Sequence, residues 1–502
     1  MRPKRYGAPA RETFFCSSVL RLGLYICAMK AVSRYIAQNR RRSLNELKTL
    51  IRFPSVSTQP EHKRDVLACA DWLAGHFRRL GLGAKLHPTK GNPIVVARTR
   101  SRSGLPTVLI YGHYDVQSPE PFELWRTPPF EPAVRGGKLF GRGASDNKGQ
   151  FFAHVKAVES YLKTGTPLPV NVVFLVEGEE EVGSACLSTF VREHARQLRA
   201  DYVIVSDTGM FAKGVPTIAY GTRGIAALEV RVDGPARDLH SGVFGGSVAN
   251  PALVLAKLLA ACVDRDGRIT VPGFYDDVQP LKPWERREFA RLKFDDKTYA
   301  RFLGVPALSG EKGYTTLERR WARPTFEING IFGGYQGSGG KTIVPARAGA
   351  KITCRLVPNQ KPETIARLVA QHLRRLCPKT VRLTITGQHH SPTFLGSPEG
   401  HGARAAARAL EKAFGRKPVF VREGGSLPIL ADFKRHLRGE IILVGLGLPD
   451  DNWHSPNEKM DLNNFYRGIA MSAELLRELG ATRRPSSRRR RCTCRLPTGH
   501  PS

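Results

Sequence analysis

Acidic and histidine residues follow several apolar runs of this chain. In "TVLIYGHYDVQSPEP", residues 107–121, an apolar run ends in His113 and Asp115, two residues apart. Side chains alternate between faces along a β-strand, so His113 and Asp115 would share one face while Tyr114 points away. At the carboxyl end of a strand in an α/β sheet, that face looks into the crevice where ligands bind. A polar strand end in water would give the same pattern, so the interpretation depends on other residues.

Four further motifs repeat this arrangement. An apolar run or a Gly-rich turn leads to Asp146 in "LFGRGASDNKG", to Glu177, Glu179, Glu180 and Glu181 in "VVFLVEGEEEVGS", to Asp207 in "DYVIVSDTG", and to His454 in the loop "LPDDNWHSPNEKM". Each alone is explained by a helix cap or a solvated first turn. Carboxylates gathered at one edge of a sheet would repel one another unless a cation neutralised them. We therefore expect a metal site with two ions. Imidazole and carboxylate ligands suit zinc, and manganese or cobalt could replace it.

The elements that must position these groups alternate in type. From about residue 43, strand-like runs such as "VNVVFLV" alternate with amphipathic helical stretches such as "NKGQFFAHVKAVESYLK", which predicts an α/β fold with a mostly parallel sheet covered by helices. After Thr217 the strands lengthen and alternate, as in "IAALEVRVDG", and helices are expected to begin at Asn250-Pro251 and at Pro362. This second texture predicts an inserted α+β domain.

The predicted domain order follows from these changes. We expect a basic, disordered extension over residues 1–42, a catalytic domain in two parts over 43–216 and 393–480, the inserted domain over 217–392, and a disordered Arg-rich tail over 481–502. Within the insertion, the Trp- and charge-rich stretch 267–336 is expected to form helical cover over the inserted sheet; shaping a substrate pocket is the alternative.

Composition places the chain among globular proteins, with 502 residues, 41% hydrophobic and 24% charged. The net charge of +34 suggests a nucleic-acid or anionic-surface partner, yet nearly half of it lies in the two ends. No apolar run is long enough to span a bilayer, and Arg21 interrupts the weak signal-like stretch near the N-terminus. The nine scattered cysteines form no paired zinc framework, which favours reduced thiols and a cytoplasmic location.

Seven ordered motifs together resemble one enzyme family. They are "GHYDV", "GRGASDNKG", "EGEEEVGS", "DLHSGVFGG", "GSGGKTIVPARAGAKITCRLVPN", "REGGSLPI" and "NWHSPNEKM". The chain resembles, over about residues 43–480, the di-zinc exopeptidases that include cytosolic non-specific dipeptidase, carnosinase, aminoacylase and succinyl-diaminopimelate desuccinylase. The dipeptidase branch fits best, because "DLHSGVFGG" and "REGGSLPI" nearly match those enzymes. The resemblance implies a metal-dependent catalytic domain with an inserted lid domain that also forms a homodimer.

The resemblance also implies roles for individual residues. Asp146 would bridge two zinc ions, with His113 and Asp207 on one and Glu181 and His454 on the other. Glu180 would be the general base, and Asp115 would orient His113. Because Glu179 is an extra acid in "EGEEEVGS", the assignment of Glu180 depends on the register set by Gly183 and Ser184.

The implied reaction is hydrolysis of an amide by a metal-activated water. His240, from the inserted domain of the partner subunit, would stabilise the oxyanion, and the C-terminal carboxylate of the substrate would meet Arg355, with Thr342, Gly425 and Ser426 as neutral donors. We therefore expect a dipeptidase or carboxypeptidase-like enzyme. An N-acyl-amino-acid deacylase or desuccinylase of the same chemistry is the alternative. A more remote alternative is a nucleic-acid or anionic-surface binding protein with a degenerate hydrolase fold, which the basic ends of the chain suggest.

Overall fold

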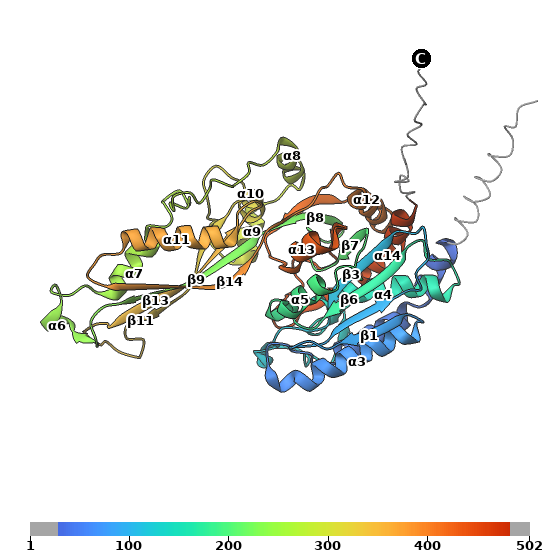
Figure 1. Ribbon diagram of the computed structural model, residues 1–502, viewed down its shortest axis with the longest axis horizontal. Helices are drawn as coiled ribbons and strands as arrows, with labels where there is room; N and C mark the ends of the chain where they lie inside the picture. Colours follow the sequence, from blue (N-terminus) through green and yellow to red (C-terminus); the bar gives the residue numbers. More distant parts are fainter. Residues whose placement is uncertain (1–28, 482–502) are drawn as a thin grey trace, which may run out of the picture.

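The computed structural model describes residues 29–481, which form a catalytic lobe and an elongated second lobe (Figure 1). The Arg-rich tail and most of the basic extension lie outside the described residues. The expectation of disorder is wrong for residues 29–42, which are helical except for a turn at Asn39. Val32 is fully buried there, and the Arg42 guanidinium pairs with the buried carboxylate of Glu159. Within residues 29–481, no helix is long and apolar enough to cross a membrane.

The catalytic lobe is built on one large mixed sheet. Its central strands β6, β3, β7 and β17 are parallel, and antiparallel strands flank them. The strand order is β1 (Gly83–His87), β2 (Ile94–Arg98), β6 (Asn171–Glu177), β3 (Thr107–His113), β7 (Tyr202–Val205), β17 (Glu440–Val444), β8 (Thr217–Thr222) and β15 (Phe394–Leu395), with β16 (Val419–Glu423) paired to β8. The predicted parallel arrangement is confirmed for the centre of the sheet, and the sheet also has antiparallel strands at its edges.

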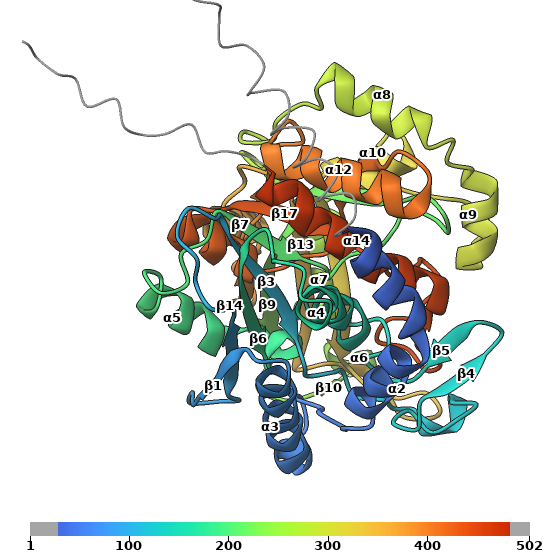
Figure 2. The same ribbon diagram turned by 90° about the vertical axis from the view of Figure 1, so that its right-hand side faces the viewer.

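Helices cover both faces of this sheet. One apolar core joins the sheet to α2 (Arg40–Ile51), α3 (Lys63–Arg79), α4 (Lys148–Lys163), α12 (His401–Phe414) and α14 (Leu462–Gly480), which lie together in Figure 2. A second core, on the other face, holds α5 (Ala185–Glu193) and α13 (Ile429–Asp432). Burial on both faces explains why β6 reads as a continuous apolar run. A small sheet of β18 (Lys459–Asp461), β5 (Lys138–Phe140) and β4 (Ala133–Arg135) lies beside this lobe.

The second lobe, called the lid here, has its own sheet and core. The strand order is β11 (Thr325–Gly333), β13 (Arg347–Leu356), β9 (Gly224–Asp233) and β14 (Arg382–Ser391), all antiparallel. Helices α7 (Pro251–Ala260) and α11 (Pro362–Leu376) pack on it, and Asn250 caps α7 through Ala252 and Leu253 N–H groups, as expected from Asn250-Pro251. At the far end, β10 (Leu239–His240) pairs with β12 (Ile343–Val344) beside α6 (Ser241–Phe244).

Two predictions about the insertion are wrong. Strand β8 pairs with β17 and β16 in the catalytic sheet, so the lid sheet begins at Gly224 and not at residue 217. The lid therefore begins one strand later than the change in sequence pattern after Thr217 suggests. Helices α8 (Pro283–Arg291), α9 (Asp296–Leu303) and α10 (Thr316–Ala322) do not cover the inserted sheet. Apolar side chains of α8 and α10, including Trp321, join the catalytic core beside β16.

Candidate active site

The carboxyl ends of four parallel strands bring the candidate ligands together. His113 ends β3, Asp207 follows β7, and Glu180 and Glu181 lie in a short helical turn after β6. His113 pairs in register with Glu177 at the end of β6, so both strands end at the same level. Asp146 precedes α4 and His454 follows β17. The predicted convergence at one edge of the sheet is therefore confirmed in the geometry.

Asp146 lies between two groups of donor atoms. On one side, its Oδ1 is 3.2 Å from His113 Nε2, which is 3.7 Å from Asp207 Oδ1. On the other side, its Oδ2 is 3.0 Å from His454 Nε2, which is 3.3 Å from Glu181 Oε2. Each group of three ligand atoms lies within 4.8 Å of one another. One carboxylate thus faces two triads, the arrangement that a bridging ligand needs.

The chemistry of this donor set fits divalent cations. His113 Nε2 and Glu181 Oε1 are buried and have no hydrogen-bond partner, which is costly unless another group satisfies them. Burial, followed by the negative charge of Asp146, raises the pKa of Glu181 to about 10. A bound cation would favour the charged carboxylate instead. His113 is fully buried and the His454 side chain is 55% exposed, so the second triad opens to solvent.

Glu180 and Glu179 have different surroundings. Burial raises the pKa of Glu180 well above its usual value, and the charges of Asp207 and Asp146 raise it further. Glu180 is thus electrostatically coupled to both triads. The Glu179 carboxylate turns away and accepts a hydrogen bond from the backbone N–H of Asn92 at 2.9 Å. This geometry supports the register that assigns Glu180, and not Glu179, to the reaction.

Asp115 lies just beyond the end of β3 and has more partners than the sequence indicates. Its Oδ1 is 3.3 Å from His113 Nδ1, as expected of an orienting group, and its backbone carbonyl is 3.1 Å from the same nitrogen. Its carboxylate also accepts hydrogen bonds from the backbone N–H groups of Glu180 and Glu181 at 3.3 and 3.2 Å. Asp115 therefore fixes both the imidazole and the turn that carries the two glutamates.

Sequence reasoning missed three positioning residues. The buried Glu458 carboxylate accepts hydrogen bonds from the backbone N–H groups of Gly143, Ser145 and Asp146 and from the Arg142 guanidinium, all at 2.8–3.0 Å. It thereby holds the loop that presents Asp146. Asn147 Nδ2 donates to Asp207 Oδ1 at 2.9 Å, and Gln117 Nε2 donates to Glu181 Oε2 at 3.0 Å. Each belongs to a quoted motif or adjoins one, but only the fold shows which ligand it holds.

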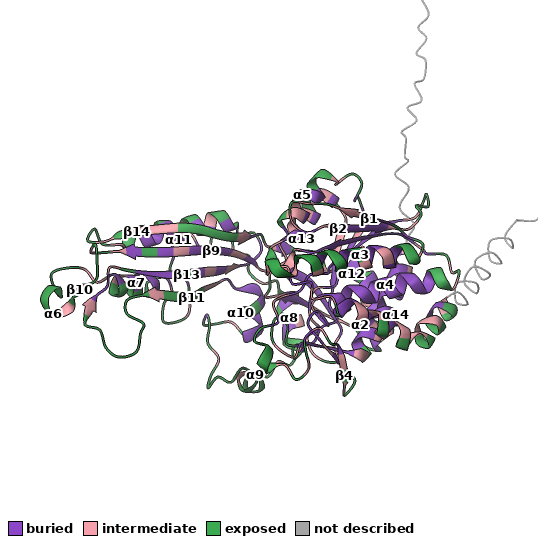
Figure 3. Ribbon diagram, turned by 90° about the horizontal axis from the view of Figure 1, so that it is seen from below, coloured by how far each residue is buried: buried purple, intermediate pink, exposed green. Residues whose placement is uncertain are grey.

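The predicted substrate contacts divide into two groups. Arg355, on β13, donates from Nη1 to Ser426 Oγ at 3.1 Å, so the lid meets the loop of Gly425 and Ser426 at the junction of the lobes. Thr342 does not join them; its carbonyl accepts from Ser241 N–H at 3.0 Å. Thr342 and His240 thus sit beside α6 at the far end of the lid, remote from the catalytic sheet (Figures 1 and 3). The structure therefore does not bring Thr342 beside Arg355 within one chain, and its role as a donor to substrate stays a prediction.

Arg223 is a further cation at this junction. Its Nε donates to the carbonyl of Gly424 at 2.9 Å, which shapes the loop ahead of Gly425. Burial, then the charge of Arg355, lowers the pKa of Arg223 to about 10. The junction therefore carries two neighbouring guanidinium groups, which favours an anionic group of a ligand.

A third group of acidic and histidine residues, Glu46, His76 and Glu159, does not resemble a metal site. Lys156 Nζ pairs with both carboxylates, and the Arg42 guanidinium pairs with both as well. Two cations therefore already neutralise the two carboxylates. The cluster ties α2, α3 and α4 together.

Two histidine and carboxylate triads that share one aspartate, with a free glutamate beside them, define a metal-dependent hydrolase. The model of peptidase family M20/M25/M40 matches residues 109–478. The chain belongs to this family, within its dipeptidase branch, and is a metallopeptidase.

Characterised relatives cover nearly the whole chain. It is 34% identical to Cys-Gly metallodipeptidase dug1 of Schizosaccharomyces pombe, over 87% of this chain and 95% of that protein. It is 31% identical to the human Beta-Ala-His dipeptidase, over 90% of this chain and 92% of that protein. Among solved structures, the M20 family metallo-carboxypeptidase Sso-CP2 from Sulfolobus solfataricus matches with a TM-score of 0.80 and 33% identity, over 87% of this chain and 99% of the other. The dipeptidase Dug1p from Saccharomyces cerevisiae matches with a TM-score of 0.79 and 29% identity, over 90% of this chain and 99% of the other.

Proposed function

We propose that this protein hydrolyses dipeptides and short peptides at the amide next to a free C-terminal amino acid, with two zinc ions and Glu180 as the general base. The observation that carries the proposal is Asp146, whose two oxygens face the His113 and His454 triads, while Glu180 adjoins Glu181 in a turn that Asp115 holds. Four side chains around the shared Asp146 carboxylate make five ligands, which are more than one tetrahedral ion uses. Manganese or cobalt could replace zinc with the same ligands.

The chain's own residues supply the proton transfers. When bound, the two cations polarise the scissile carbonyl and lower the pKa of a water molecule. Glu180 accepts the proton of the attacking water and later donates it to the leaving amine. Asp115 keeps Glu180 in place, because it accepts hydrogen bonds from the backbone of that turn. His113 and Asp207 would hold one cation, Glu181 and His454 would hold the other, and Asp146 would contribute to both.

A free C-terminal carboxylate is the anion that best suits the junction of the lobes. Arg355 can bind it in a bidentate manner, while Ser426 and the Gly425 backbone offer neutral donors. The names of the relatives, which include Cys-Gly and Beta-Ala-His dipeptidases, support small dipeptides as substrates. An N-acyl-amino-acid deacylase would use the same residues, but these relatives do not favour it.

The proposal includes a homodimer formed through the lid. Apolar side chains stand exposed on this lobe, among them Val243 at 68% and Ile331 at 65% exposed, and β11 is an edge strand. Exposed apolar side chains and a free strand edge are features of association surfaces. His240 and Thr342 lie too far along the lid to meet the donor set of their own chain, so a partner's lid would deliver them.

A cytoplasmic location completes the proposal. Cys69, Cys186, Cys262, Cys354 and Cys377 are free thiols in residues 29–481. Free thiols persist in reducing compartments.

The test combines metal analysis with a substrate panel. The purified protein, stripped of metal and titrated with zinc or manganese, should reach full turnover of Cys-Gly, Ala-Gly or carnosine at two ions per chain. N-acetylated amino acids should be hydrolysed much more slowly. Full turnover at one ion per chain would contradict the two-metal proposal, and faster hydrolysis of the acetylated compounds would favour the deacylase.

A further inference from the structure

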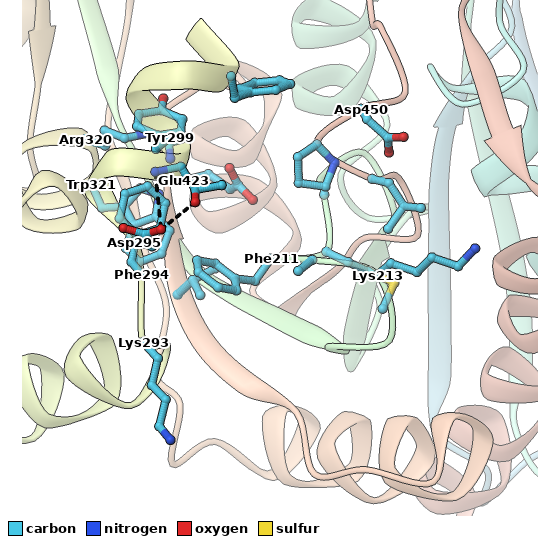
Figure 4. A pocket seen from close by; sticks show the side chains of 18 of the residues that line it. Phe211, Lys213, Lys293, Phe294, Asp295, Tyr299, Arg320, Trp321, Glu423 and Asp450 are labelled. Carbon is cyan, nitrogen blue, oxygen red and sulfur yellow. Dashed lines mark hydrogen bonds between the residues drawn. The ribbon is translucent and has the colours of Figure 1, made fainter. Parts of the chain in front are cut away.

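One cavity of the catalytic lobe is lined by basic side chains and, within residues 29–481, by no acidic one. Its volume is about 460 Å³, and its lining contains Lys85, His87, Arg98 and His194. A larger cavity of about 790 Å³ has a mixed lining, in which Glu423 and other carboxylates accompany basic side chains (Figure 4). We call the smaller cavity the basic pocket, defined by its four basic side chains. Its volume lies within the range of small-molecule sites.

Strand pairing places three of these basic residues on one face of the sheet edge. β1 is the edge strand, and it pairs antiparallel with β2 so that Gly83 lies opposite Arg98. Alternate residues of a strand share a face, so Lys85 and His87 stand on the same side of the sheet as Arg98. Because Gly83 has no side chain, the space beside the Arg98 side chain stays open.

The opposite wall of the basic pocket comes from the end of α5 and the residues that follow it. The rings of Phe190 and His194 are stacked with centroids 4.0 Å apart, and the His87 ring lies 5.0 Å from that of Phe190. His194 Nδ1 donates to the Phe190 carbonyl at 3.1 Å. Arg98 Nη1 donates to the Gln197 carbonyl at 2.7 Å. These two carbonyls are therefore already bonded, and the wall is tied to both α5 and β2.

The positive charge of the basic pocket is not neutralised by the protein. Burial, followed by the charges of His194, Lys85 and Arg98, lowers the pKa of His87. Burial also lowers the pKa of Arg98. A carboxylate close to either group would act in the opposite direction. Within the described part of the chain, none of the four basic side chains forms an ion pair, so the pocket is open to an anion.

The floor of the basic pocket is apolar. Val96, Phe190 and Leu198 line it, and all three are buried in the second core of the catalytic lobe. This core holds the floor in place before a ligand enters. A ligand that carries an anionic group and a small organic part would contact the basic side chains and the apolar floor together.

The basic pocket is separate from the candidate active site. Arg98 of β2 lies opposite Val173 of β6. Glu177, at the end of β6 beside the candidate ligands, is four residues further along, which is about 13 Å in an extended strand. β1 lies one strand further outward. A ligand in the basic pocket would therefore not belong to the donor set around Asp146.

We infer that the basic pocket binds a phosphate monoester of a small organic molecule. A phosphate monoester carries close to two negative charges at pH 7, which suits a site with several cations. Because Arg98 uses Nη1 for the Gln197 carbonyl, its Nε and Nη2 remain for two phosphate oxygens. Lys85 adds a point charge, and the organic part would lie on the apolar floor. Binding here does not depend on the proposed hydrolase reaction.

Isothermal titration calorimetry of the metal-loaded protein tests the binding, with phenyl phosphate as the probe. We expect a Kd below about 1 mM. Phenyl sulfate has the same ring and a single charge, and inorganic phosphate lacks the ring, so each should bind about fivefold more weakly or worse. Absence of phenyl phosphate binding would overturn the inference. Equal binding of phenyl sulfate or of inorganic phosphate would overturn it as well.

Charge substitutions locate the binding. Lys85→Glu reverses an exposed charge of the basic pocket and should weaken phenyl phosphate binding by about tenfold or more. Gly83→Glu places a carboxylate opposite Arg98, where a Cβ would meet no atom closer than 3.9 Å, and should weaken binding too. Lys90→Glu, at an exposed position outside the lining, is the matched control with the same change in charge as Lys85→Glu, and should keep the wild-type Kd within about threefold.

Thermal unfolding of each variant shows that it is folded. Equal losses of affinity in Lys85→Glu and Lys90→Glu would overturn the inference, because the binding would then follow the overall charge of the protein. So would a wild-type Kd in Lys85→Glu and Gly83→Glu.

Crystallography shows the position of the anion directly. Tungstate, which has the shape of phosphate, should give an anomalous peak beside Lys85 and Arg98 when it is soaked into crystals of the metal-loaded protein grown without phosphate or sulfate. Peaks confined to the donor set around Asp146 or to Arg355 at the junction of the lobes would overturn the inference.

Discussion

Glu180 differs from its neighbour Glu179 in what surrounds its carboxylate. The Glu179 carboxylate accepts a hydrogen bond from the backbone N–H of Asn92. Glu180 is close enough to Asp146 and Asp207 for their charges to raise its pKa. A general base must lie beside the group whose proton it takes, so the geometry distinguishes two residues that the sequence leaves adjacent.

Glu180→Gln should retain both metal ions and lower kcat by about a thousandfold, because the amide cannot accept a proton while all five ligands remain. Steady-state kinetics with metal analysis of the same sample measure this. Glu179→Gln is the matched control and should keep wild-type turnover. If Glu179→Gln shows the large loss and Glu180→Gln does not, the register in "EGEEEVGS" is wrong.

Glu458 acts through the loop that presents Asp146. Both of its oxygens accept backbone N–H groups, so Glu458→Gln would direct an amide NH2 at one of them. We expect metal affinity to fall about ten- to a hundredfold, while the fold is kept. Competition with a chelator measures the affinity, and excess metal should restore most of the turnover. Loss of turnover that excess metal does not restore would show that Glu458 does more than position the loop.

At the scale of elements, the sequence predicts those helices, strands and strand-end residues that a pattern of a few neighbouring residues determines. The alternation of apolar runs and helices, and the acidic or histidine residue at each strand end, are visible because they repeat within a few residues. The sequence pattern places strand β8 in the wrong sheet because its partners, β16 and β17, lie about 200 residues further along. Helices α8 to α10 follow the lid strand β9 in sequence, yet Trp321 packs with the catalytic core. The sequence does not reveal the role of Glu458 because its partners near Asp146 lie over 300 residues earlier. No local pattern carries such distant pairings.

His76, in α3, should make the protein sensitive to acid. Burial, followed by the charge of Lys156, lowers the pKa of His76 from 6.5 to about 3 in the fold. Above pH 6.5 both the folded and the unfolded chain keep it neutral, so it has no effect. Below pH 6.5 the unfolded chain gains a proton that the folded chain does not, so stability falls with pH.

Between pH 7 and pH 5 this single group should cost about 2 kcal/mol of the free energy of unfolding. His76→Phe keeps a ring stacked on Trp72 and removes the titrating group. Between pH 7 and pH 5 the free energy of unfolding of this variant should therefore fall by about 2 kcal/mol less than that of wild type. Urea unfolding of the metal-free protein at several pH values measures the difference. Identical pH slopes in the two proteins would show that His76 takes up its proton equally in the folded and unfolded chains, so that burial does not lower its pKa.

At the scale of the whole molecule, the lid separates residues that the proposed reaction would bring together. The donor set lies on the catalytic sheet, while His240 and Thr342 lie beside α6 at the opposite end of the lid (Figure 1). His240 Nδ1 accepts the Gly242 backbone N–H at 3.0 Å, which fixes the imidazole on its exposed loop. A two-fold dimer built on the exposed lid strands would bring each His240 towards the other chain's donor set.

Complementation tests this shared site. His240→Ala and Glu180→Gln should each be nearly inactive alone, the first for lack of the donated imidazole and the second for lack of the base. After subunit exchange, half of the dimers are mixed, and each mixed dimer has one site with an intact Glu180 and an intact His240 from its partner. Activity should therefore rise to about a quarter of wild type for random pairing. Exchange must be shown separately, by mass measurement of tagged chains. If mixed dimers form and remain inactive, His240 acts within its own chain or has no part in the reaction.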